Sequence, residues 1–249
     1  MSGRPAARIY FPCPIAAGGR IELSPDQAHR LRSVLRLGAG AAIAVFNRDD
    51  GEWVCRIDEL GKSRARATVQ SRLRLPELEP DLWLLFAPIK RARLDWLVEK
   101  ATELGASVLM PVWTARTQVE RLNIERLQAH AISAAAQSER LSVPELRAPE
   151  PLDAVLACWP PGRSLIVCDE TGVSAPIGEA LAQLSAEPAA LLVGPEGGFN
   201  QSELDALDKL SFVSRVGLGP RVLRAETAAV AALALFQGIA GDWRQSRSR

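Results

Sequence analysis

The alternation of short apolar stretches with longer amphipathic stretches beyond Asp81 constrains the fold more than any other feature of this sequence. Strands are expected at 82–87, 108–112, 164–168, 189–193 and 212–216, and helices at 92–104, 124–138 and near the carboxyl end. Strands that are separated by helices are typical of a parallel sheet with helices on its faces. The sequence therefore predicts an α/β domain from residue 80 to residue 249.

The first seventy residues follow a different, β-rich pattern. Short strands are expected at 8–11, 41–46, 52–57 and 64–70. Asp49-Asp-Gly51 has the composition of a hairpin turn, and Gly61 marks the next reversal, so these strands should form a small antiparallel sheet or barrel. One helix begins at Ser24-Pro-Asp26, and its apolar residues Leu31, Val34 and Leu35 are expected on one face.

Charge divides the chain at about the same place as the pattern. Pro76 and Pro80 lie in a short, stiff stretch that predicts a linker between a domain at 1–73 and a domain at 80–249. Residues 1–75 hold 13 Lys or Arg against 7 Asp or Glu, whereas the remainder holds 17 against 22. A basic segment on a mildly acidic body favours contact with a polyanion, although a genome rich in Arg codons can produce the same bias.

The remaining composition excludes several other classes of protein. Apolar residues make up 47% and charged residues 24% of the chain, as in an ordinary folded protein. No apolar run approaches the roughly 20 residues that span a bilayer, and the first residues do not resemble a secretory signal, so we expect a cytoplasmic protein. The four cysteines form no CxxC pair and only two histidines accompany them, so no metal site is expected.

Two segments carry the chemistry, and each follows a predicted strand, where open α/β sheets bind their ligands. In the first, Gly194-Pro-Glu-Gly-Gly198, the glycines permit close approach of a ligand to the backbone, and Asn200 or Ser202 caps the next helix. The glycine spacing fits neither a P-loop nor a dinucleotide-binding loop. A generic glycine-rich turn remains an alternative for this segment taken alone.

The second segment is Leu218-Gly-Pro-Arg-Val-Leu-Arg-Ala-Glu-Thr-Ala228, which runs into an alanine-rich helix. Arg221 and Arg224 precede the helix, and Glu226 and Thr227 fall in its first turn, where a carboxylate suits the helix dipole. Surface ion pairs would explain the arginines equally well in isolation. Beside a glycine-rich ligand loop, however, two arginines are suited to hold a phosphate or a developing oxyanion.

Together these segments resemble the paired loops of the RsmE family, the uridine-N3 methyltransferases of small-subunit ribosomal RNA. The resemblance extends over nearly the whole chain. It includes Lys100-Ala-Thr-Glu-Leu-Gly105, Gln137-Ser138 with Arg140, Val143-Pro-Glu145, Arg8-Ile-Tyr-Phe11 and Val34-Leu-Arg-Leu37. The chain departs from the family at Ala136 and Glu139, where Glu and Gly are common, and at Asp169-Glu-Thr171, the counterpart of the first cofactor loop.

The resemblance implies a PUA-like barrel followed by a SPOUT domain with a carboxyl-terminal trefoil knot, which sequence pattern alone could not indicate. It also implies the cofactor S-adenosylmethionine (SAM), a homodimer with cofactor sites near the interface, and small-subunit ribosomal RNA in an assembled subunit as the substrate. The expected cofactor-binding residues are Leu192, Gly194, Pro195, Glu196, Gly197, Gly198, Leu218, Gly219, Leu223 and Thr227.

Methylation at uridine N3 requires the loss of the imide proton, so the enzyme must favour the uracil anion. Arg221 or Arg224 is expected to stabilise charge on the uracil oxygens, and Glu226 is expected either to accept the proton or to orient an arginine. In the basic domain, phosphate contacts are expected from Arg8, Arg30, Arg32 and Arg36.

Two other functions remain open at this stage. Knotted methyltransferases of ribose 2′-hydroxyls have a similar glycine loop, but their last motif usually reads Ser-Leu-Asn where this chain has Arg-Ala-Glu-Thr. A ribosome-assembly factor with a vestigial cofactor pocket is the non-enzymatic alternative. The intact glycines of both loops argue against it, and a cofactor titration would separate the two.

Overall fold

The structure is a computed structural model that describes residues 5–171, 174–184 and 188–244. The described chain forms two compact units, and each is treated by itself below. The N-terminal unit comprises residues 5–78 together with 135–143, and the C-terminal unit comprises 79–134 with the described residues from 144 onward. Residues 135–143 therefore cluster with the basic first segment, although the sequence pattern placed them inside a continuous second domain. The bounds 1–73 and 80–249 stay a prediction.

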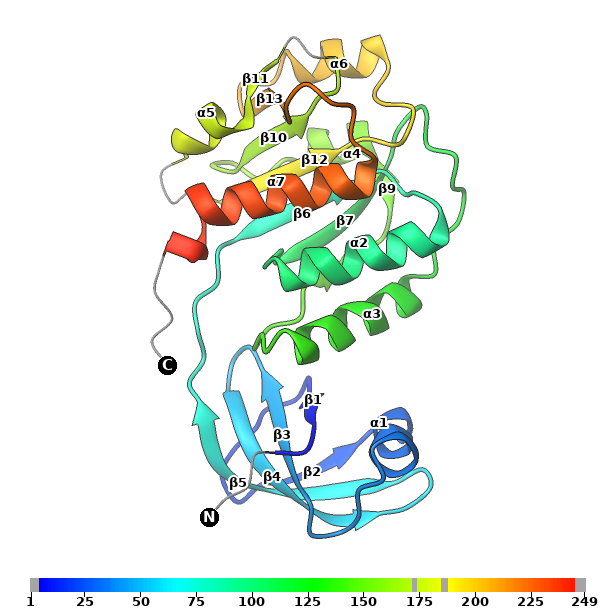
Figure 1. The fold of residues 1–249 in the computed structure, drawn as a ribbon, viewed down its shortest axis with the longest axis vertical. Coiled ribbons are helices and arrows are strands. Elements are labelled where there is room, and N and C mark those ends of the chain that lie inside the picture. The colour runs from blue at the N-terminus through cyan, green and yellow to red at the C-terminus, as the bar shows by residue number, and fades with distance from the viewer. Residues whose placement is uncertain (1–4, 172–173, 185–187, 245–249) are drawn as a thin grey trace. The chain divides into compact units, whose positions relative to one another are not determined.

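A five-stranded sheet forms the N-terminal unit, with the strand order β1-β3-β4-β5-β2 (Figure 1). Its strands are β1 (Arg8–Tyr10), β2 (Arg20–Leu23), β3 (Ala42–Asn47), β4 (Gly51–Leu60) and β5 (Ala65–Arg74). β1 pairs with β3 in parallel, and the remaining pairs are antiparallel. The buried side chains of all five strands pack into one core.

The turns of this sheet are those that the sequence predicted. Gly51 has a φ of +80°, and a Cβ on it would lie 2.2 Å from the carbonyl oxygen of Arg74, so only glycine fits the β3–β4 hairpin. Asp50 accepts hydrogen bonds from the backbone of Ile15 and the side chain of Asn47. Strand β2 was missed because its four residues stand alone after Gly18-Gly19, without a neighbouring pattern to support them.

One expectation for this unit is wrong. Helix α1 (Pro25–His29) begins with the expected cap at Ser24, but the chain then widens into a π-helical turn, η1 (Arg30–Val34). The wider turn changes the direction of the side chains that follow. Leu31 is fully buried, whereas Val34 and Leu35 are 66% and 37% exposed. The three residues therefore do not share a buried face.

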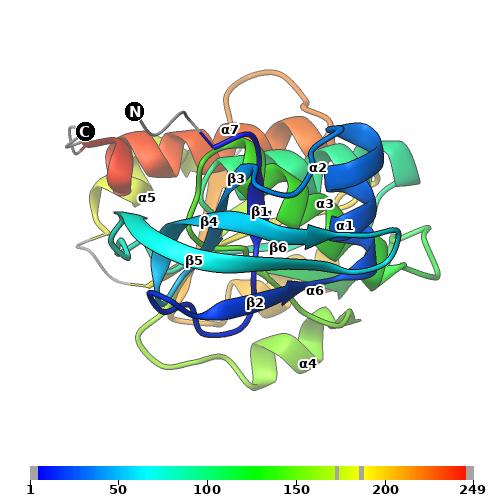
Figure 2. The ribbon, with the colours of Figure 1, turned by 90° about the horizontal axis from the view of Figure 1, so that it is seen from below.

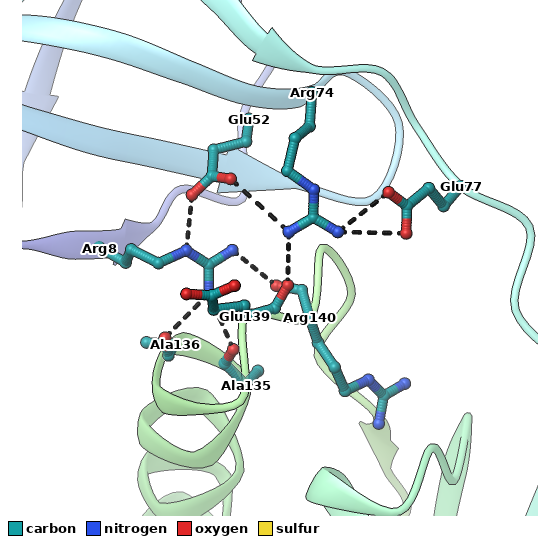
Figure 3. Close-up of polar contacts among 8 residues, drawn as sticks. All are labelled: Arg8, Glu52, Arg74, Glu77, Ala135, Ala136, Glu139 and Arg140. Carbon is teal, nitrogen blue, oxygen red and sulfur yellow. Dashed lines mark hydrogen bonds and ion pairs between the residues drawn. The ribbon is translucent and has the colours of Figure 1, made fainter. Parts of the chain in front are cut away.

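Residues 135–140, which follow most of helix α3 (Ile124–Gln137) and belong to the N-terminal unit, contact the sheet through a part-buried cluster around Arg8 (Figure 3). The Arg8 guanidinium donates to the carbonyl oxygens of Ala135, Ala136 and Arg140 at 2.8–3.1 Å, and to Glu52 at 2.5 Å. It also lies 4.3 Å over the ring of Phe46. One cation thereby donates to several carbonyls at a helix end, where the last carbonyls lack partners within the helix.

Arg74 continues this cluster. Its guanidinium donates to the carbonyl oxygen of Glu139 at 2.7 Å and pairs with Glu77, while Glu52 lies 3.7 Å away. Glu139 has a φ of +61°, the left-handed conformation that commonly ends a helix and that glycine adopts most readily. Glycine would adopt this conformation with less strain, so Glu139 is a less favourable residue at this position.

The C-terminal unit is built on an eight-stranded sheet whose recorded pairs are all parallel. The strands follow the order β11-β13-β10-β12-β6-β7-β8, and β9 pairs with β7. Their bounds are β6 (Leu82–Phe86), β7 (Val108–Trp113), β8 (Glu145–Leu146), β9 (Glu150–Pro151), β10 (Ser164–Cys168), β11 (Ala175–Pro176), β12 (Ala189–Val193) and β13 (Val213–Gly217). The expected α/β fold with a parallel sheet is confirmed.

Helices cover both faces of this sheet, as Figures 1 and 2 show. α2 (Arg91–Glu103), α5 (Ile177–Ala182) and α7 (Ala225–Ile239) pack against one another on one face. α4 (Leu152–Ala157) and α6 (Gln201–Leu207) share a core with the other face, and the short η2 (Asp242–Arg244) follows α7. No helix in the described ranges is long and apolar enough to cross a membrane.

We predict that Arg8→Met destabilises the N-terminal unit by about 3 kcal/mol, because Glu52 and three carbonyl groups lose their buried donor. Hydrogen exchange of the β4 amides, read by mass spectrometry, measures the loss in the unit concerned. Arg32→Met is the matched control, since Arg32 is exposed and its removal should change stability by less than about 0.5 kcal/mol. If Arg8→Met left the exchange rate unchanged but weakened RNA binding, the structural role of Arg8 would be wrong. The expected phosphate contact would then be favoured.

Candidate functional site

A cavity of about 380 Å³ opens at the carboxyl edge of the parallel sheet. Three chain segments line it, and they follow the neighbouring strands β10, β12 and β13. Their described lining residues lie within 168–171 and 174–176, within 193–204 and within 217–228. Parallel strands end at the same edge, which is why loops that are far apart in sequence meet here.

The glycine segment after β12 forms a tight turn in which Gly198 donates its backbone N–H to the carbonyl oxygen of Pro195. Gly198 has a φ of +66°, and a Cβ on it would lie 2.0 Å from a carboxylate oxygen of Glu170. A Cβ on Gly194 would lie 3.0 Å from the ring of Phe199. Both glycines therefore keep the backbone close to the cavity, and the turn leads to α6 with the predicted cap at Asn200.

Asp169 fixes the loop after β10. Its side chain is 2% exposed and accepts hydrogen bonds from Ser174, from the backbone and hydroxyl of Thr171, and from Arg215 of β13, at 2.6–2.9 Å. Burial by itself would raise the pKa of this carboxyl, but the hydrogen bonds from Ser174, Thr171 and Arg215 outweigh it and lower the pKa to about 2. Asp169 is therefore ionised at neutral pH and ties β10, its loop and β13 together.

Most of the predicted cofactor-binding residues line this cavity. They are Gly194, Pro195, Glu196, Gly198, Leu218, Gly219 and Leu223. Leu192 instead lies fully buried within β12, Gly197 packs against the stem of Arg116, and Thr227 is exposed on α7. The roles of all ten residues in cofactor binding stay a prediction.

The three residues expected to act in catalysis are placed differently from one another. Arg221 lines the cavity. Arg224 is exposed at the position before the first residue of α7, and its side chain makes no cap hydrogen bond. Glu226 is buried, but it does not line the cavity, because Ala225 and Ala228 occupy the side of α7 that does.

Glu226 belongs to a short chain of ion pairs that passes through Arg93 of α2. The guanidinium of Arg93 lies 3.5 Å from Glu226 and 3.8 Å from Glu196 of the glycine loop. The second carboxylate oxygen of Glu226 is buried and has no hydrogen-bond partner in the described part of the chain. Arg93 thus links the first turn of α7 to the glycine loop.

The loop after β7 holds the glycine segment from outside. Arg116 donates to the carbonyl oxygen of Gly197 at 2.6 Å, and the backbone N–H of Ala115 donates to Glu203 of α6 at 2.8 Å. Glu203 also accepts from the backbone of Asn200, which completes the capping box of α6. Both contacts brace the glycine turn in its observed shape.

Sequence reasoning missed Arg93 and Arg116 as contributors to this site, and it named Asp169 only as part of a divergent counterpart of the first cofactor loop. Asp169 carried a signal, because it directly follows a predicted strand at the sheet edge where ligands bind. Arg93 and Arg116 carried none that distinguishes them from other arginines. Their place depends on which strands are neighbours, and the strand order was not predicted.

The four arginines expected to bind RNA also separate into two kinds. Arg8 is buried in its cluster, whereas Arg30, Arg32 and Arg36 are exposed around η1. The geometry of Arg8 favours a structural role over a phosphate contact. As for metals, no group of three or more His, Cys, Asp or Glu in the described ranges could hold an ion.

Comparison with known proteins agrees with this architecture. Residues 76–237 match the family model of an RNA methyltransferase domain, and residues 23–70 match that of an RNA methyltransferase PUA domain. Ribosomal RNA small subunit methyltransferase E of Rickettsia conorii is 33% identical over 91% of this chain and 93% of its own length.

Solved structures extend the likeness to three dimensions. A ribosomal RNA small subunit methyltransferase E from Neisseria gonorrhoeae, bound to SAM, is 28% identical with a TM-score of 0.85, over 95% of this chain and 99% of that one. A Legionella pneumophila structure in complex with SAM is 31% identical with a TM-score of 0.87, over 96% and 100%.

A PUA-like unit together with a parallel α/β unit that carries these loops defines an RNA methyltransferase. More narrowly, the chain belongs to the ribosomal RNA small subunit methyltransferase E family.

We predict that Asp169→Asn weakens SAM binding, because the loop that lines the cavity loses its charged anchor and Arg215 loses a buried partner. The loss of stability should be about 2 kcal/mol at neutral pH. Since the folded-state pKa is below the ordinary value, the stabilisation from Asp169 is complete above about pH 4 and is lost as the pH falls toward 2.

Calorimetric titration with SAM and thermal unfolding at several pH values measure both effects. Asp208→Asn is the matched control, since Asp208 pairs with the same arginine but is half exposed and does not contact the loop. If Asp169→Asn and Asp208→Asn bound SAM equally well, the anchoring role of Asp169 would be wrong.

Proposed function

We propose that this chain is a SAM-dependent methyltransferase that methylates N3 of a uridine in small-subunit (16S) ribosomal RNA. The observation that carries the proposal is the cavity at the carboxyl edge, lined by both signature loops of a family whose named members act on this RNA. The solved relative from Neisseria gonorrhoeae binds SAM. Since this chain matches that structure over 95% of its length with a TM-score of 0.85, SAM is the proposed cofactor.

The cavity residues fit SAM chemically. Its volume lies within the range of small-molecule sites, and the glycines leave backbone groups open to a ligand. Leu218, Leu223 and Phe199 offer apolar walls for an adenine ring. Glu170 and Glu196 bring negative charge to a cofactor that carries an ammonium and a sulfonium group.

The bound cofactor supplies an electrophilic methyl group, and the protein must supply a uracil that has lost its N3 proton. Arg221 lines the cavity and Arg224 lies three residues further on, and we propose that one of them stabilises negative charge on the uracil oxygens. The pKa of the imide proton falls when its anion is stabilised, which makes the nucleophile available near neutral pH.

We assign Glu226 to orientation. Its side chain faces Arg93 and not the cavity, so proton acceptance from a base in the cavity is not favoured by its position. By pairing with Arg93, it links α7 to the glycine loop through Glu196. Solvent, or a group on the RNA, is then left as the proton acceptor.

The finer features of the fold belong to the same proposal. We propose a SPOUT domain with a trefoil knot, because β13 lies between β10 and β11, which are consecutive in the chain, and α7 then returns to pack on β12 and α5. We propose that such a path passes the end of the chain beneath an earlier connection. An experimental structure in which the chain path is not knotted would contradict this proposal.

We also propose a homodimer. Trp96 of α2 and Leu235 of α7 are 42% and 39% exposed, on two helices that pack against each other. Apolar side chains of this size on adjoining helices are typical of an interface with another chain. Sedimentation equilibrium of the purified protein measures the mass directly, and a monomer at micromolar concentration would contradict the proposal. Localisation to the cytoplasm stays a prediction.

The decisive experiment is methyl transfer from labelled SAM to small ribosomal subunits that lack their own modification, followed by mass analysis of the nucleosides. We expect 3-methyluridine, with assembled subunits preferred over free RNA. A 2′-O-methylated nucleoside would indicate the ribose-methylating alternative. SAM binding without transfer to either substrate would contradict the proposed reaction, and the absence of SAM binding would favour a non-catalytic assembly factor.

We predict that Arg224→Ala lowers kcat by about 10²-fold, with a smaller change in the KM for RNA, because the side chain acts on charge that develops in the transition state. Steady-state transfer at saturating SAM measures both constants. Arg244→Ala is the matched control, since Arg244 is exposed beyond the opposite end of α7. Full turnover of Arg224→Ala at saturating RNA would remove Arg224 from catalysis.

A further inference from the structure

The turn after α1 presents two apolar side chains to solvent. Val34 is 66% exposed and Leu35 is 37% exposed, and we call these two residues the apolar tip. Their neighbour Leu31 is fully buried, so the turn is firmly packed at its base. The tip therefore offers a small apolar surface that a ligand can cover.

Three arginines flank the apolar tip in the sequence. Arg30, Arg32 and Arg36 are all exposed. Among the described residues, none of these three arginines forms a side-chain hydrogen bond or ion pair. Arg8 and Arg74, by contrast, both pair with carboxylates. Three unpaired guanidinium groups within seven residues form a strongly positive surface, which favours a polyanionic partner.

The backbone of the turn is also unusual. Arg30–Val34 is a π-helical turn, and Arg36 has a φ of +55°, a left-handed conformation that residues with a side chain rarely adopt. π-helical turns and left-handed non-glycine residues occur frequently at functional sites. Here both features lie in the turn that carries Val34 and Leu35.

We propose that the apolar tip contacts an unpaired nucleobase of the substrate RNA while Arg30, Arg32 and Arg36 contact the phosphates on either side. This inference rests on the proposed function and extends it to the form of the RNA. The N3 atom of uridine lies on the Watson–Crick edge, so the target must be unpaired before it can be methylated. RNA around such a base exposes base faces that an apolar side chain can cover.

A second copy of this chain is the competing occupant of the tip. Charge argues against it, because a two-fold interface would bring the same three arginines of each copy together. RNA provides the opposite charge for the arginines and an apolar base face for Val34. These observations favour an RNA contact at the tip. The charge of the three arginines would provide affinity, and the apolar side chain of Val34 would favour unpaired over paired RNA.

The test is equilibrium binding of the full chain to a short oligouridylate and to a fully paired RNA duplex of the same length. We expect Val34→Ser to weaken oligouridylate binding about fivefold and to leave duplex binding unchanged. Arg32→Gln should weaken binding to both RNAs and reduce the salt dependence of binding, because one phosphate contact is lost. In Val34→Ser the salt dependence should stay the same.

Leu78→Ser is the matched control, since Leu78 is a fully exposed apolar residue of the same unit, outside the tip. Both serine variants should melt at the wild-type temperature, because neither side chain is packed. Wild-type affinity of Val34→Ser for oligouridylate would overturn the inference, and a loss of dimer mass in that variant would assign the tip to a second copy. Methyl transfer by the wild-type chain is measured in parallel. A failure of the proposed methyltransferase function can then be distinguished from a failure of the proposed RNA contact at the tip.

Discussion

Parallel pairing of β10, β12 and β13 is the constraint on which the site depends. Because the three strands run side by side in one direction, their loops meet at one edge and enclose one cavity. The buried ion pair between Asp169 and Arg215 joins the ends of β10 and β13, and Arg93 and Arg116 hold the glycine loop after β12. Each loop is short or glycine-rich, so its shape comes from these contacts more than from its own propensity.

Arginine serves two physical purposes in this chain. Arg8, Arg74 and Arg215 are partly or largely buried and satisfy carbonyl or carboxylate groups, which makes them part of the folded framework. Arg30, Arg32 and Arg36 are exposed. The net charge includes the buried arginines as well as the exposed ones. It therefore overestimates the number of cations that are available to bind a polyanion. The distinction is visible only when the partners of each guanidinium are known.

Much of the fold followed from local patterns in the sequence. The long strands β6, β7, β10 and β12, the hairpin at Gly51 and the cap of α6 were predicted because each rests on a few adjacent residues. The glycine and arginine segments were also identified from their composition. The order of the strands, the joining of 135–143 to the first unit and the contacts of Arg93 depend on distant residues, which periodicity does not encode. The π-helical turn at Arg30 was missed because its sequence suits an ordinary helix equally well.

Cys168 lines the cavity at the end of β10, and burial raises the pKa of its thiol to about 12. A protonated thiol is a weak nucleophile, whereas a thiolate attacks alkylating groups readily. A pocket built to hold a reactive electrophile can therefore keep sulfur in its wall without being consumed by it. The same packing that ends the strand thus keeps the thiol of Cys168 protonated beside the cavity.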